Sequence, residues 1–109
     1  MFAKTDTAMP DATTYLASPT ARVRYYAADH YGQMAHLFTG RGAELRPVLA
    51  DPDPTVVAAA TWALGRLGDA QAGPWIEPLL QHEAQGVRAT AAASLLALRT
   101  GTDALIAAR

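Results

Sequence analysis

The sequence contains no cysteine, which excludes disulfide bridges, thiolate chemistry and zinc sites built from thiols. Aromatic side chains are also few, at 7% of the residues. No apolar run reaches the roughly 18 residues that a membrane-spanning helix needs. The first residues include Lys4 and Asp6 and lack the apolar stretch of a secretory signal. We therefore expect a soluble, cytoplasmic protein without a membrane partner.

The sequence has no excess of positive charge either. Nine lysine and arginine residues stand against ten acidic residues, which gives a net charge of −1. Residues 51–86 hold five acidic residues and a single basic one, Arg66. Proteins that bind nucleic acid normally concentrate positive charge on one face. Nucleic acid is therefore a less favoured partner than protein.

Alanine, in contrast, is abundant, with 25 of the 109 residues, and half of the chain is hydrophobic. Alanine has the highest helix propensity, and its small side chain lets helices approach closely. The length corresponds to one domain that is large enough to bury a core. These features predict an all-α domain.

Residues 51–69 carry the strongest helix signals. Asp51 and Asp53 are capping residues, and each precedes a proline that suits a first helical turn. Gly68 can adopt the left-handed conformation that ends a helix. The apolar residues between these signals follow helical spacing, and they are Val56, Ala59, Ala60, Ala63, Leu64 and Leu67. The segment therefore predicts a helix over residues 54–67.

The same pattern occurs three times in the chain. A leucine is followed seven positions later by a valine at 16 and 23, at 49 and 56, and at 80 and 87. The matching stripe in the first copy is Val23, Tyr26, Ala27, His30, Tyr31 and Met34, and in the third it is Val87, Thr90, Ala91, Ser94, Leu95 and Leu98. Three copies in one register indicate an internal repeat.

A break and a shorter apolar segment follow each long helix. The breaks lie at 40–42, 68–74 and 100–103, and each contains glycine. They predict second helices at about 43–50, 74–82 and 103–109. A short helix from Asp11 through Leu16 precedes the repeats, and residues 1–10 are predicted to be a disordered tail.

Two antiparallel helices per period of about 30 residues are typical of an α-solenoid. We therefore predict one domain over residues 11–109, folded as a right-handed α-solenoid of about three antiparallel helix pairs. The repeats are expected at about 18–50, 51–82 and 83–109.

Two stretches of the middle copy resemble a known family. Residues 51–56 read Asp-Pro-Asp-Pro-Thr-Val, and residues 62–69 read Trp-Ala-Leu-Gly-Arg-Leu-Gly-Asp. This pattern is similar to the short bacterial HEAT-like repeat that was first associated with phycobilisome lyases. The resemblance covers about residues 16–109 and implies a HEAT-like solenoid fold.

The resemblance also implies ladders of arginine and aspartate between successive repeats. Arg24 and Arg88 match the family's arginine, and Asp51 matches its aspartate. The chain departs from the pattern at Ser18, Val57 and His82, so neither ladder is continuous.

The sequence holds few groups that could carry catalysis or bind a metal. His82 and Glu83 form a single pair of iron-binding type, and we interpret them as a loop histidine beside a solvated carboxylate. His30 lies on the apolar stripe, where we expect a buried histidine with a hydrogen-bond partner. We expect no enzyme activity, no cofactor and no metal.

Several residues are candidates for binding a partner. Arg22, Arg24 and Tyr25 form a basic and aromatic cluster at the start of the first repeat, and the candidates later in the chain are Arg41, Glu44, Arg46, Trp75, Glu77 and Gln81. Tryptophan and arginine often dominate binding energy. We expect Trp62 to have a packing role, whereas Trp75 could serve either packing or binding.

We therefore expect a non-catalytic scaffold that binds another protein on the concave face of the solenoid. The alternatives are a cofactor- or chromophore-handling protein of the lyase type and, less favoured, a nucleic-acid-binding protein that uses the first repeat. Leu105 and Ile106 are expected to be exposed at the end of the last helix, where a second copy of the chain could cover them.

Overall fold

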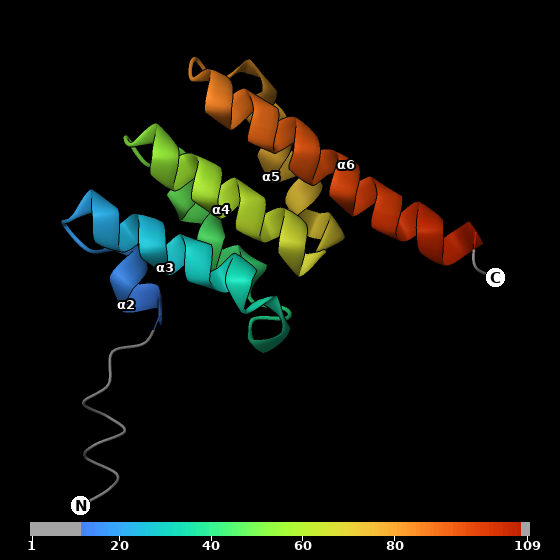
Figure 1. Ribbon diagram of the computed structural model, residues 1–109, viewed down its shortest axis with the longest axis horizontal. Helices are drawn as coiled ribbons and strands as arrows, with labels where there is room; N and C mark the ends of the chain where they lie inside the picture. The colour runs from blue at the N-terminus through green and yellow to red at the C-terminus, as the bar shows by residue number, and fades with distance from the viewer. Residues whose placement is uncertain (1–11, 108–109) are drawn as a thin grey trace, which may run out of the picture.

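The computed structural model describes residues 12–107, and the side chains of residues 12–100. The predicted tail at residues 1–10 lies outside this range. Long helices form one layer, with α3, α4 and α6 side by side, and shorter helices lie behind them (Figure 1). The long layer consists of α3 (Ala21–Gln33), α4 (Pro54–Leu67) and α6 (Gln85–Ala107), preceded by α2 (Ala12–Leu16). The short helices are η1 (Ala35–Leu37), η2 (Gly42–Ala50), η3 (Ala70–Ala72), α5 (Gly73–Ile76) and η4 (Glu77–Gln81).

Helix α4 begins and ends where its sequence signals predict. The Asp53 carboxylate accepts a hydrogen bond from the Thr55 amide at 2.9 Å, and Pro54 occupies the first turn. Gly68 has a φ of 71°, a left-handed backbone conformation that residues other than glycine rarely adopt. The predicted all-α repeat fold is confirmed, since residues 12–107 form helices and turns without a strand.

The long helices approach one another closely at glycines. A Cβ atom added at Gly32 of α3 would lie 2.3 Å from the Trp62 ring, and one added at Gly65 of α4 would lie 2.7 Å from the Ser94 hydroxyl. The two glycines occupy the same position in successive repeats, because each lies nine positions after the repeat's valine. Trp62 therefore packs against α3, as predicted. Between α4 and α6, the buried Ser94 hydroxyl donates a hydrogen bond to the Thr61 carbonyl at 2.8 Å.

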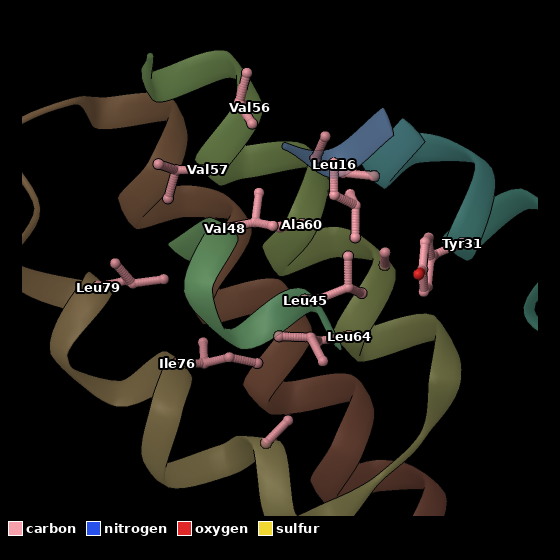
Figure 2. Packing of buried hydrophobic residues seen from close by; sticks show 14 of the residues in the cluster. Leu16, Tyr31, Leu45, Val48, Val56, Val57, Ala60, Leu64, Ile76 and Leu79 are labelled. Carbon is pink, nitrogen blue, oxygen red and sulfur yellow. The ribbon is translucent and has the colours of Figure 1, made fainter. Parts of the chain in front are cut away.

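The core lies between the two layers (Figure 2). Both layers contribute fully buried side chains, among them Tyr31, Leu45, Val57, Leu64 and Ile76. Helix α4 is buried on several sides because α3, α6 and η2 all pack against it. Within residues 12–107, no helix is both long and apolar enough to cross a membrane.

The apolar stripe predicted for α3 is only partly correct. Tyr31 is fully buried, but Tyr26 is 60% exposed. His30 is also exposed, and its ring meets the Phe38 ring edge to face, so the prediction of a buried histidine is wrong. The reason is that α4 packs against the side of α3 that carries Ala28 and Gly32. The equivalents of Tyr26 and His30 in α4 are Ala59 and Ala63, and both of these are buried.

The first two second helices lie within one residue of their predicted bounds but are more tightly wound than an α-helix. Residues 42–50 form a 3₁₀ helix throughout, and residues 73–81 change from α-helix to 3₁₀ helix after Ile76. Pro47 and Pro78 lie within these segments. Each proline lacks an amide donor, and its ring clashes with the carbonyl four residues earlier in α geometry. The prolines therefore account for the departure from a regular α-helix.

The predicted break at residues 100–103 and the separate helix at 103–109 are wrong. Helix α6 continues from Gln85 through Ala107. The first two breaks are each followed by a proline, whereas residues 100–109 contain none, and one glycine inside a helix costs only about 1 kcal/mol. The side chains of Leu105 and Ile106 lie outside the described residues, so self-association through them stays a prediction.

Candidate partner-binding surface

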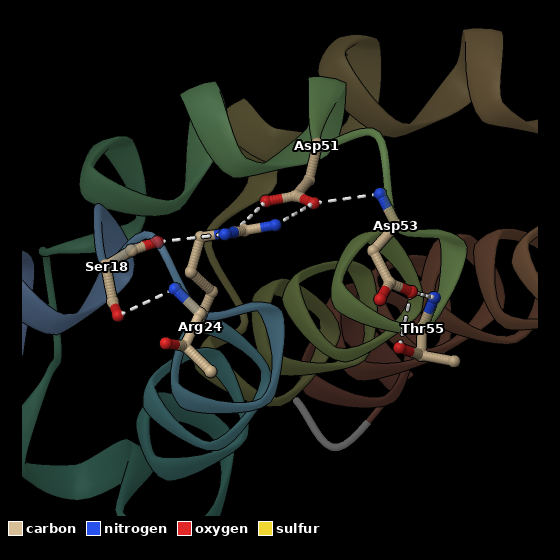
Figure 3. A network of polar contacts seen from close by, with 6 residues as sticks. Ser18, Arg24, Asp51, Asp53 and Thr55 are labelled. Carbon is tan, nitrogen blue, oxygen red and sulfur yellow. Dashed lines mark hydrogen bonds and ion pairs between the residues drawn. The ribbon is translucent and has the colours of Figure 1, made fainter.

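Arg24 and Asp51 form an ion pair between the first two repeats (Figure 3). The Arg24 Nε donates to one carboxylate oxygen at 2.7 Å, and Nη2 donates to the other at 3.1 Å. The remaining Nη1 donates to the Ser18 carbonyl at 2.8 Å. The two side chains are 16% and 7% exposed, respectively. The predicted pairing of Arg24 with a carboxylate of the neighbouring repeat is confirmed. Arg24 therefore stabilises the contact between the repeats.

The same contacts shift the pKa of both partners. Burial alone would raise the pKa of Asp51, but hydrogen bonds from Arg24 and the Asp53 amide, with the charge of Arg24, lower it below its ordinary value. The hydrogen bond to Asp51 raises the pKa of Arg24. Asp51 is therefore an ionised residue that ties the start of α4 to α3.

Ser18 and His82 replace the family's aspartate, but each still accepts a backbone hydrogen bond as Asp51 does. The Ser18 hydroxyl accepts a hydrogen bond from the amide two residues later at 3.1 Å, and the Asp51 carboxylate does the same at 2.9 Å. In the third repeat, His82 Nδ1 accepts from the Ala84 amide at 3.0 Å. All three side chains therefore cap the turn before a long helix, but Asp51 alone among them also binds an arginine within the described residues.

Between the second and third repeats, the ladder lacks both its arginine and its aspartate. Val57, fully buried, stands where α3 carries Arg24, and His82 stands where the second repeat carries Asp51. A buried arginine without its carboxylate would be strongly destabilising. The two departures therefore compensate each other.

Arg41 and Glu44 also bind each other. Arg41 donates two hydrogen bonds to the Glu44 carboxylate, at 2.8 and 2.9 Å, and the Tyr31 hydroxyl donates a third. The Arg41 guanidinium lies 4.9 Å from the centre of the Phe38 ring. These contacts hold the turn before η2 against α3, so a change at Glu44 would disturb the fold as well as the surface.

Five candidate residues lie on the second helices. One of them, Glu44, binds Arg41, and we call the other four the second-helix row: Arg46, Trp75, Glu77 and Gln81. Arg46 on η2 reaches across to α5, where its guanidinium lies 5.1 Å from the centre of the Trp75 ring. Trp75 is half-buried, whereas the other three side chains are exposed. The row therefore presents an aromatic ring, an arginine, a carboxylate and an amide on adjoining repeats.

Arg22 and Tyr25 lie elsewhere, at the start of α3. They line a shallow groove of about 390 Å³ together with Tyr26, Asp53 and Thr55. The structure describes no hydrogen bond, ion pair or ring contact between this groove and the second-helix row among residues 12–100. The nine predicted residues therefore fall into separate groups, which are the residues on α3, the Arg41–Glu44 pair at the start of η2, and the second-helix row.

The sequence prediction missed an open groove of about 820 Å³ between η4 and α6. Leu80, Leu95 and Leu98 supply its apolar lining, and Glu77 and Arg99 contribute charged groups. The sequence pattern placed these leucines in the repeats, and it carries no signal that the surface between η4 and α6 is hollow.

Within the described part of the chain, no group of three or more histidine, aspartate or glutamate side chains could hold a metal ion.

Comparison with known proteins adds one positive finding. A model of HEAT repeats matches residues 42–108, which is more than half of the chain. A search of curated proteins finds no match. The internal repeats and the stacked helix layers agree with a HEAT repeat fold. The chain belongs to the HEAT repeat family.

Proposed function

We propose that the chain is a non-catalytic scaffold that binds another protein through the second-helix row. HEAT repeats commonly serve as protein-interaction scaffolds. In solenoids, the successive repeats each present a few side chains on one extended, usually concave, surface. The row follows this pattern because its four residues come from the second helices of two successive repeats.

The observation that carries the proposal is the contact between Arg46 and Trp75. Both residue types are enriched among those that dominate binding energy at protein interfaces. The indole is half-buried against the core, so its orientation is fixed before a partner arrives, and the guanidinium remains exposed above it. A preorganised aromatic surface loses little conformational entropy on binding.

The charges of the row indicate the chemistry of the partner. Arg46 is positive and Glu77 is negative, and both are exposed. A partner that carries an acidic and a basic group on either side of an apolar contact would complement them. This mixed surface supports a protein partner over nucleic acid. So does the use of Arg24 and Arg41 for ion pairs with Asp51 and Glu44. A cytoplasmic location stays a prediction.

Charge reversal in the row tests the proposal. A double variant, Arg46→Glu with Glu77→Arg, should retain the fold because both side chains are exposed. We expect it to lose a protein that the wild type captures from cells of origin, with affinity reduced by at least about tenfold. Glu44 stays unchanged because it binds Arg41 and Tyr31.

A matched control reverses the same two charge types elsewhere. Arg22→Glu with Glu83→Arg also exchanges one arginine and one glutamate at exposed positions. This control should capture the protein as well as the wild type does. If the control loses the partner and the row variant keeps it, the binding site lies near Arg22 or Glu83 and the proposal is wrong.

A further inference from the structure

The three long helices can be compared position by position through the repeat register. The register that aligns the three repeat valines also aligns Gly32 of α3, Gly65 of α4 and Leu96 of α6. The glycines allow the following long helix to approach closely. Leu96 instead projects from the corresponding face, and it is 64% exposed. A further long helix could not stack on α6 as closely as α4 stacks on α3.

The rest of this face is open as well. In α4, the residues on the side of α6 include Val57, Thr61 and Leu64, and all three are fully buried. Their equivalents in α6 are Arg88 and Ala92, which are exposed, and Leu95, which is half-buried. We call the residues Arg88, Ala92, Leu95, Leu96 and Arg99 the outer face of α6. It adjoins the groove of about 820 Å³ through Leu95 and Arg99.

Arg88 on this face repeats the arrangement of Arg24. Its Nη1 donates to the carbonyl six residues earlier, that of His82, at 2.7 Å, and also to the Glu83 carbonyl at 3.0 Å. Arg24 makes the same contact with the Ser18 carbonyl, while its Nε and Nη2 hold Asp51. Within residues 12–100 the structure shows no carboxylate on the corresponding atoms of Arg88. This guanidinium is therefore held in position to receive one.

Arg99 places a second positive charge on the same face. It is eleven residues from Arg88, or about three helical turns and roughly 16 Å along the axis. Its side chain is exposed and borders the groove. The outer face of α6 thus has an apolar centre, formed by Ala92, Leu95 and Leu96, between two arginines.

We infer that the outer face of α6 binds an acidic amphipathic helix of another protein, parallel to α6. A carboxylate at the start of that helix would pair with Arg88 as Asp51 pairs with Arg24, and a second carboxylate about three turns along would meet Arg99. A small side chain must lie opposite Leu96. The first repeat of a second copy is a poor occupant, because Ser18 takes the place of the aspartate and the bulky Tyr26 projects from its α3.

The test uses the full chain and one synthetic peptide. The peptide is a helix of about five turns with aspartate at its start, glutamate about three turns later, and alanine and leucine on the face between them. We expect fluorescence anisotropy to show binding, and Arg88→Glu with Arg99→Glu to weaken it at least about tenfold. A peptide with lysine in place of both acids should bind this variant better than it binds the wild type.

Three controls show whether the outer face of α6 itself binds the peptide. Arg22→Glu, which makes the same type of substitution at one exposed position on α3, should leave peptide binding within about twofold. The single row variant Arg46→Glu, which lies outside the groove beside α6, should also bind the peptide, so failure of the second-helix row and failure of this site are distinguishable. Thermal unfolding should show that the α6 variant is folded. Failure of the wild type to bind, equal binding by the α6 variant, or self-association through this face at the concentrations used would overturn the inference.

Discussion

Val57→Arg should lower the free energy of unfolding by about 3–5 kcal/mol, the loss expected when a buried charge has no partner. Val57 is a fully buried residue of α4, and it occupies the position where α3 carries Arg24. Arg24 is tolerated because Asp51 binds it. At the second step the matching residue is His82, whose Nδ1 already accepts the Ala84 amide. Urea denaturation of the variant and the wild type measures the difference.

Adding His82→Asp should recover about 1–3 kcal/mol of this loss, which is the size of coupling found between residues in direct contact. The introduced aspartate would bind the introduced arginine and would still accept the Ala84 amide. His82→Asn is the matched control, because asparagine can accept the amide but carries no charge. If the aspartate and asparagine variants restore the stability of Val57→Arg equally, a missing ion pair does not explain why Val57 and His82 occur together.

Asp51→Ala should destabilise the chain by about 2–3 kcal/mol, somewhat less than the value for a deeply buried pair because Arg24 keeps partial contact with solvent. The substitution removes both the carboxylate on Arg24 and the acceptor of the Asp53 amide. Asp51→Asn keeps an acceptor for that amide and removes the charge alone. We therefore expect Asp51→Asn to lie between the wild type and Asp51→Ala in urea denaturation near neutral pH.

The stabilisation by Asp51 should disappear in acid. Although burial opposes it, the hydrogen bonds and charge that hold Asp51 lower its pKa in the folded chain, so the folded state favours the ionised form. Its contribution is fully present above the ordinary aspartate pKa of about 4 and is lost as the pH falls through the lower folded value. The stability difference between the wild type and Asp51→Asn should therefore narrow below about pH 4. A difference that stays constant with falling pH would contradict the ionic explanation.

The long helices could be predicted because their signals are local. Asp53, Pro54 and Gly68 fix the ends of α4, and the spacing of leucine and valine fixes the register of α3 and α6. The 3₁₀ winding of the second helices was not predicted, since the apolar pattern of a short segment fits both helix types. The continuation of α6 through Gly101 was not predicted because glycine alone does not distinguish a turn from a helix interior.

The binding surface could be predicted only in part, because its contacts join distant residues. The Arg41–Glu44 pair joins residues that are three positions apart at the start of η2, and this local contact could have been found from the sequence. The Arg46–Trp75 contact crosses two repeats and depends on how η2 and α5 pack. The exposed position of Leu96 required the structure, although aligning it with Gly32 and Gly65 in the sequence would have shown the substitution.

Hydrogen exchange of the chain, with and without the protein that the wild type captures, tests the central claim most directly. Binding through the second-helix row should slow exchange of the amides in residues 42–50 and 73–81 by at least about tenfold. Amides in residues 21–26, at the start of α3, should exchange at the same rate in both samples. Protection at residues 21–26 without protection in either second-helix segment would contradict the proposed binding surface.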